Sequence, residues 1–115
     1  MPRNRKEIVR SSAAPAPVGP YSQAVRAGSL VFVSGQIPVD PATGRIVEGG
    51  IGKQTERCLT SLQVILEQAG CGMDRVVKTT VFMTDLGRFT EMNAVFETFF
   101  PEAPPARATV QVVAL

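Results

Sequence analysis

Three segments of the chain are apolar at nearly every position, and they constrain the fold more than any other feature. They are Leu30–Val33, Val76-Val77 with Val81-Phe82-Met83, and Val110 with Val112-Val113. A strand with one solvated face alternates apolar and polar residues, whereas a strand that is apolar throughout is covered on both faces. The chain must therefore build a sheet with apolar side chains on both of its faces.

Two other segments have the periodicity of amphipathic helices. The first is residues 52–69, whose apolar residues form one helical stripe and which Gly70 should end. The second stripe, rich in phenylalanine, runs from Phe89 to Phe100 and stops at Pro101. Two helices can cover only one face of a sheet, so we expect the other face to be covered by self-association.

The remaining apolar segments complete a single α/β (α+β) domain over residues 1–115. The predicted strands are residues 7–10, 22–26, 30–34, 75–83 and 107–115. Gly28 suits a hairpin turn between the second and third strands, and residues 11–20 and 38–52 are expected to be loops. The predicted order is β-β-β-α-β-α-β, with one mixed sheet and two helices on one face.

Composition narrows the setting of this domain. The chain has 115 residues, 44% of them apolar, which is enough to bury a core without disulfides. No apolar run matches a signal peptide or a membrane span, so we expect a cytoplasmic protein with no membrane partner. Cys58 and Cys71 are then reduced thiols, Cys58 on the apolar face of the first helix. The net charge of +2, with both signs interspersed, disfavours nucleic acid as a partner.

Several kinds of chemistry are disfavoured by residue type. The chain has no histidine, which removes the commonest general base and the usual zinc ligand. Residues 49–55 (Gly-Gly-Ile-Gly-Lys-Gln-Thr) partly match a phosphate-binding loop. However, Val47 replaces the first glycine, and Gln54 stands where Ser or Thr must hold magnesium. That stretch is better interpreted as a helix N-terminus, and we predict no metal and no cofactor.

A few polar residues beside turns remain as candidates for a site, and each also has a purely structural interpretation. Tyr21 follows Gly-Pro and could simply pack at the edge of the core. Ser34-Gly35 could simply end a strand, and Asn93 could be a solvated helix residue. Arg107 opens the last strand behind two prolines and could form a surface ion pair with Glu102.

Five short motifs, taken together, resemble the RidA (YjgF) family. They are Gly19-Pro20-Tyr21-Ser22-Gln23-Ala24, Phe32-Val33-Ser34-Gly35-Gln36-Ile37-Pro38, Val77-Lys78-Thr79-Thr80-Val81-Phe82, Asp85-Leu86 with Met92-Asn93, and Pro105-Ala106-Arg107-Ala108-Thr109-Val110. They follow one another at the spacings expected of the family. The resemblance covers about residues 7–115.

The resemblance implies a chorismate-mutase-like fold assembled as a homotrimer with clefts between subunits. Active members of the family are 2-iminobutanoate/2-iminopropanoate deaminases, which convert reactive enamines and imines to 2-oxo acids and ammonia. By this match the candidate catalytic residues are Arg107, Tyr21 and Ser34, with Arg107 binding the substrate carboxylate. The substrate-binding residues would be Gly35, Asn93, Arg107 and Thr109.

The chemistry of the substrate suits these residue types. A 2-imino acid presents a planar carboxylate, which a guanidinium can hold in a two-bond fork. Imines hydrolyse unaided in water, so a catalyst needs only to orient a water molecule and stabilise the carbinolamine. A histidine base is not required for this reaction.

The sequence departs from the family in two places. Some members carry Cys where this chain has Thr109, a position that can act through its backbone alone. The family also continues beyond the position of Leu115 through one more strand, which bears a glutamate proposed to orient the attacking water. We expect a longer form to carry that strand. The alternative function is a non-catalytic small-carboxylate binder, or a translation inhibitor or ribonuclease of the same family.

Overall fold

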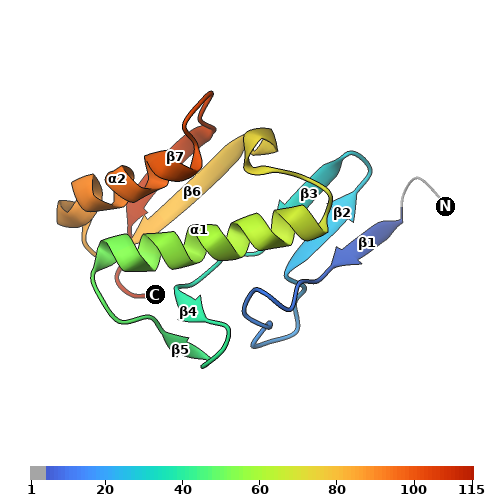
Figure 1. Ribbon diagram of the computed structural model, residues 1–115, viewed down its shortest axis with the longest axis horizontal. Coiled ribbons are helices and arrows are strands. Elements are labelled where there is room, and N and C mark those ends of the chain that lie inside the picture. The colour runs from blue at the N-terminus through green and yellow to red at the C-terminus, as the bar shows by residue number, and fades with distance from the viewer. Residues whose placement is uncertain (1–4) are drawn as a thin grey trace.

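The computed structural model describes residues 5–115 and contains the five predicted strands and two predicted helices in the predicted order, with two further short strands before the first helix (Figure 1). The elements are β1 (Lys6–Val9), β2 (Ala24–Ala27), β3 (Leu30–Val33), β4 (Val39–Asp40), β5 (Arg45–Ile46), α1 (Ile51–Gln68), β6 (Lys78–Met83), α2 (Phe89–Phe99) and β7 (Ala106–Gln111), with short 3₁₀ turns η1 (Met73–Arg75) and η2 (Leu86–Arg88). The fold class is the predicted mixture of strands and two helices.

The β2–β3 hairpin forms where the sequence predicts it. Ala27 pairs with Leu30 across a two-residue turn, and Gly28 adopts a φ of +60°. That conformation is strained for residues with a Cβ, which explains a glycine here. Beside the turn, the guanidinium of Arg26 donates to the carbonyl of Ala69 at the end of α1. This contact fastens the hairpin to the helix terminus.

The segment 38–52 is not wholly a loop, contrary to our prediction. It contains the small hairpin β4–β5, in which Val39 pairs with Ile46. The Asp40 side chain accepts a hydrogen bond from the Ala42 N–H at 2.8 Å, and Gly44 has a φ of +73°. Such a side-chain turn lets a very short hairpin close. Helix α1 begins directly after the two glycines that follow, as the sequence indicates.

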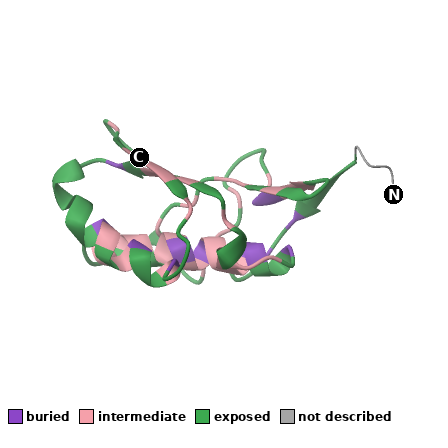
Figure 2. Ribbon diagram, turned by 90° about the horizontal axis from the view of Figure 1, so that it is seen from above, coloured by how far each residue is buried: buried purple, intermediate pink, exposed green. Residues whose placement is uncertain are grey.

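Both helices lie in one layer, and the strands form the other (Figure 2). Helix α1 runs along most of the molecule and takes part in two separate clusters of buried residues. One cluster joins the end of α1 to β1 and β2 (Val9, Ala14, Ala24, Ile65 and Ala69). The other joins the first half of α1 to β6 and α2 (Leu59, Met83, Met92, Phe96 and Phe100). Within residues 5–115, no helix combines the length and apolarity needed to cross a membrane.

The strands do not form the single continuous sheet that we predicted. Hydrogen bonds join β1, β2 and β3 into one antiparallel ladder, and a separate parallel ladder joins β6 to β7. Among the described residues, β3 pairs only with β2, and β6 pairs only with β7. Helix α1 therefore holds the two ladders in one layer by packing against both, without hydrogen bonds between them.

Two predicted strands are also shorter than expected. The segment before β6 contains the turn η1, so the strand begins at Lys78 instead of residue 75. Strand β7 ends at Gln111, although the Val112 N–H still donates to the Met83 carbonyl at 2.8 Å. Beyond that bond the last residues leave the ladder, because β6 has already ended at Met83.

The strand face away from the helices is apolar and uncovered, as the sequence predicts. The exposed residues on it are Ile8, Leu30, Phe32, Phe82 and Val110, each between 38% and 58% exposed. They lie in register across the ladders, since Val25 pairs with both Ile8 and Phe32, and Phe82 pairs with Val110. An apolar surface of this kind typically marks a contact with another protein surface.

Candidate functional site

The Arg107 guanidinium is held between β7 and α2 without using its hydrogen-bonding capacity. Arg107 is the second residue of β7 and pairs in register with Thr79. Its guanidinium carbon lies 4.8 Å from the ring centroid of Phe96 and 5.5 Å from that of Phe89. Among the hydrogen bonds and ion pairs of residues 5–115, none involves this guanidinium, so the ion pair with Glu102 that we considered does not form.

Stacking on an aromatic ring fixes the plane of a guanidinium while leaving its N–H groups free at the edge. The two phenylalanines, which the sequence marks only as part of an apolar stripe, therefore have a second role here. They hold the Arg107 guanidinium beside the groove that Phe96 and Arg107 both line.

Arg107 lies in an open groove of about 790 Å³ at the edge of the β6–β7 ladder. The residues that line it come from α2, from the following loop and from the start of β7: Asn93, Phe96, Glu97, Phe100, Pro101, Pro104, Pro105 and Arg107. The structure thus brings together two of the residues that the sequence singled out, Asn93 and Arg107. The prolines restrict the backbone of the loop between α2 and β7.

Glu97 is a groove residue that the sequence reading missed. It lies four residues after Asn93, so the two side chains share one face of α2. That i, i+4 spacing was the available signal. Glu97 is exposed, and it forms no ion pair within 4.0 Å with any residue of 5–115.

Thr109 follows Arg107 by two residues on β7, so both point to the helix side of the strand. Its hydroxyl oxygen is buried and has no hydrogen-bond partner among the described residues. A buried hydroxyl without a partner is uncommon, because it costs free energy to desolvate. Thr109 does not line the groove itself.

The other three candidates belong to a different part of the chain. Ser34 follows β3, and its hydroxyl donates to the carbonyl of Ser22 at 2.6 Å. The Tyr21 hydroxyl accepts from the Val18 N–H at 3.3 Å, while its side chain remains half exposed. Gly35 is exposed, and a Cβ built there would meet nothing within 4 Å. None of the three lines the groove of their own chain.

Gln23, which the sequence reading treated only as part of a motif, organises this second region. Its side chain is buried; the Oε1 atom accepts from the Ser11 N–H at 2.7 Å. Its Nε2 atom donates to the carbonyls of Ser11 at 3.1 Å and of Pro15 at 2.9 Å. The Pro-rich loop 11–20 is thereby held against the start of β2, which positions Tyr21 and the end of β3.

The partly buried Cys58 thiol is a poor nucleophile, and the described residues hold no cluster of metal ligands. Burial raises the pKa of Cys58 to about 11, an effect that the positive charge of Arg57 partly offsets. Cys58 is therefore a neutral thiol near pH 7, and both it and Cys71 are free, as predicted. Across residues 5–115, no three His, Cys, Asp or Glu side chains gather as metal ligands.

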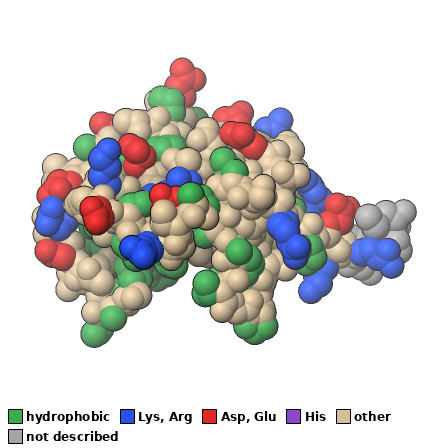
Figure 3. Space-filling view, turned by 60° about the horizontal axis from the view of Figure 1, so that its bottom comes forward, with side chains coloured by type: hydrophobic (Ala, Val, Ile, Leu, Met, Phe, Trp, Pro, Cys, Tyr) green, Lys and Arg blue, Asp and Glu red, His purple; other side chains and the backbone are tan. Residues whose placement is uncertain are grey.

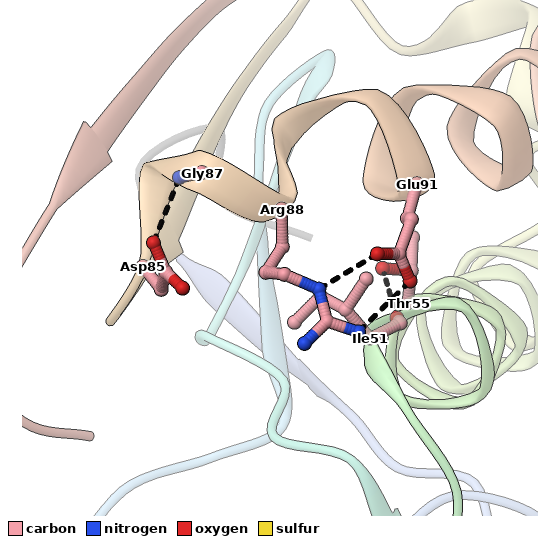
Figure 4. A network of polar contacts seen from close by, with 6 residues as sticks. All are labelled: Ile51, Thr55, Asp85, Gly87, Arg88 and Glu91. Carbon is pink, nitrogen blue, oxygen red and sulfur yellow. Dashed lines mark hydrogen bonds and ion pairs between the residues drawn. The ribbon is translucent and has the colours of Figure 1, made fainter.

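Arg88, at the start of α2, shows what a guanidinium paired with a carboxylate looks like (Figure 4). Its Nε and Nη2 atoms donate to the two carboxylate oxygens of Glu91 at 2.7 and 3.0 Å. This pairing lowers the pKa of Glu91, chiefly through the side-chain hydrogen bond. Arg107, on the same α2–β7 unit, has no such partner among the described residues.

Comparison with known proteins places the chain. The family model described as Endoribonuclease L-PSP matches residues 11–115. The chain belongs to the RidA (YjgF) family. A RutC family protein of Pyrococcus abyssi is 49% identical over 93% of this chain and 84% of its own length. The mouse 2-iminobutanoate/2-iminopropanoate deaminase is 41% identical over 96% of this chain and 82% of its own length.

Solved structures of the RidA family agree with the fold. The structure of Escherichia coli TdcF with bound serine is 40% identical, covers 95% of this chain and 87% of that chain, and superposes with a TM-score of 0.90. The strand and helix arrangement described above is therefore that of the family. Relatives in the family differ in the activities that their names state, so the family alone does not give the reaction of this chain.

Proposed function

We propose that the chain hydrolyses 2-imino acids, as a 2-iminobutanoate/2-iminopropanoate deaminase, to 2-oxo acids and ammonia. The observation that carries this proposal is the Arg107 guanidinium, which is stacked on Phe96, unpaired among residues 5–115 and open to a groove. The mouse relative is named for this reaction. The serine in the TdcF structure is a small amino acid with the carboxylate that Arg107 is suited to bind.

The reaction itself demands little acid or base strength. The guanidinium fork would hold the carboxylate, which fixes the imine carbon in the groove. A water molecule adds to that carbon, and the resulting carbinolamine releases ammonia to leave the 2-oxo acid. The Asn93 side chain could hydrogen-bond the substrate from the helix side, and the unpartnered Thr109 hydroxyl lies two residues from the carboxylate site.

The site is proposed to lie between chains of a homotrimer. In one chain the groove holds Asn93 and Arg107 but lacks Tyr21, Ser34 and Gly35. The same chain leaves an apolar strand face uncovered. Both features would be explained if a neighbouring chain covers that face and contributes its Tyr21–Gly35 region to the groove. Sedimentation at micromolar concentration should then show a trimer, and a stable monomer would contradict the shared site.

The decisive experiment is a coupled assay for imine hydrolysis. A pyridoxal-phosphate-dependent dehydratase generates 2-iminobutanoate, and 2-oxobutanoate formation is followed with and without this protein. We expect faster formation of 2-oxobutanoate with the protein, and an unchanged rate would contradict the proposal.

The protein should also be incubated with RNA, because the family model is described as an endoribonuclease. Acidic and basic side chains are interspersed over the left part of the face drawn in Figure 3, and several basic side chains gather toward its right.

A further inference from the structure

The groove carries one charge of each sign, and the two do not neutralise each other. Arg107 provides the positive charge from β7, and Glu97 provides the negative charge from α2. Neither is paired with another charged residue of the described chain. A ligand that bears only a carboxylate would use the first charge and be repelled by the second. A ligand with both a carboxylate and a cationic nitrogen would use both.

The position of Glu97 on its helix strengthens this contrast. Glu97 lies in the last turn of α2, which ends at Phe99 and contains no basic residue. The C-terminal end of a helix already carries partial negative charge, so a carboxylate there is unfavourable for the helix. The helix end and the carboxylate therefore add to one negative region on the α2 side of the groove. Nothing in the described chain offsets it by an ion pair.

We propose that Glu97 and the C-terminal end of α2 form a subsite for the cationic nitrogen of the ligand. This inference rests on the proposed function, because it identifies the reactive form of the substrate as the protonated iminium. The iminium carries a carboxylate for Arg107 and an NH₂⁺ group for Glu97. The groove thereby selects a zwitterion over a simple carboxylate.

The subsite also favours release of the product. Hydrolysis adds water to the C=NH₂⁺ carbon, and the nitrogen leaves with the two protons it carries and two from water, as NH₄⁺. The remaining 2-oxo acid keeps the carboxylate but no longer has a positive charge. It loses the attraction of Glu97 and experiences its repulsion instead, so the product binds more weakly than the substrate.

The test compares two unreactive ligands that differ only in this charge. They are (S)-2-aminobutanoate, a zwitterion, and (S)-2-hydroxybutanoate, an anion, and their dissociation constants are measured by NMR titration. For the wild-type protein we expect tighter binding of the amino acid. In Glu97→Gln the preference should fall by about threefold, the size of an exposed charge interaction. High salt should shrink the wild-type preference in the same direction.

The matched control is Glu67→Gln, which removes an exposed carboxylate near the far end of α1. It should leave the preference unchanged. An unchanged preference in Glu97→Gln, or an equal loss in Glu67→Gln, would overturn the subsite. Because Glu97 opposes the helix dipole, Glu97→Gln should not lower the unfolding temperature. A wild-type protein that fails to hydrolyse imines would contradict the proposed function. The binding preference between the two ligands would still test the Glu97 subsite, because it does not depend on catalysis.

Discussion

Gln23 and Arg107 are both polar side chains held firmly by the fold, but they differ in what they bind. Both the oxygen and the nitrogen of the Gln23 amide form hydrogen bonds with backbone groups of the loop 11–20. Arg107 is positioned by two aromatic rings, and its N–H groups contact no acceptor in the described chain. A polar group that the protein satisfies serves the fold, while one that it positions and leaves unsatisfied is available to a ligand. Replacing either residue should therefore affect a different property.

The largest expected effect is on stability, at Gln23. Replacing Gln23 by Ala leaves the Ser11 N–H and two loop carbonyls without their partner, which should lower the unfolding free energy by about 3 kcal/mol. Chemical denaturation at fixed chain concentration measures this. The control is Gln68→Ala at the exposed end of α1, which should change stability by less than about 0.5 kcal/mol. Equal effects of the two variants would remove the structural role of Gln23.

The next effect is on activity, at Arg107. Lysine keeps the charge but cannot reproduce the fork or the stacking. We expect Arg107→Lys to lower kcat/KM for 2-iminobutanoate by roughly 30- to 100-fold, or about 2–3 kcal/mol, with little change in unfolding. Arg88→Lys is the control, since its guanidinium is engaged with Glu91, and it should stay within about twofold of wild type. Wild-type kinetics of Arg107→Lys would exclude Arg107 from the site.

Part of the fold could be predicted from the sequence alone, and part of it could not. The helices and most strands were predictable, because stripes of apolar residues and the punctuation at Gly28, Gly70 and Pro101 are local signals. The break between the β1–β3 and β6–β7 ladders was not, because strand pairing depends on contacts between distant segments. The β4–β5 hairpin was missed because it is held by one aspartate turn instead of an apolar pattern.

The candidate site was predictable only in part, for a related reason. Arg107 and Asn93 could be found as polar residues in unusual places, and they do share a groove. The order of residues in the chain does not show which polar groups have hydrogen-bond partners within the folded protein. The Ser34 hydroxyl bonds the Ser22 carbonyl, and the Gln23 amide bonds the loop 11–20, while Glu97 in the groove has no ion-pair partner among residues 5–115.

A third prediction concerns Cys58, whose thiol is kept protonated by burial. Burial raises its pKa from 9.0 to about 11, so the folded chain keeps the proton longer than the unfolded chain does. Stability is then unaffected below pH 9 and falls as pH rises from about 9 to about 11, by about 1–2 kcal/mol. Denaturation across that range should show a smaller decline for Cys58→Ala than for wild type. An identical decline in both proteins would show that Cys58 stays accessible to water.

The smallest effect is expected at the Arg88–Glu91 pair. Arg88 is an arginine, like Arg107, but its hydrogen bonds are made within the protein, like those of Gln23. Its side chains are about half exposed, so water and salt screen their attraction. Glu91 also lies in the first turn of α2, where a carboxylate is favoured, whereas Arg88 caps the same positive end. Glu91→Gln should therefore destabilise the chain slightly more than Arg88→Gln.

The lowered pKa of Glu91 means that its contribution to stability is present above the unfolded carboxyl pKa and is lost as the pH falls through the folded value. Thermal unfolding of both variants over the carboxyl titration range measures this, with Glu91→Gln losing less stability on acidification than wild type. Because both variants remove the same ion pair, a larger loss in Arg88→Gln would show that the helix dipole does not decide the difference between them.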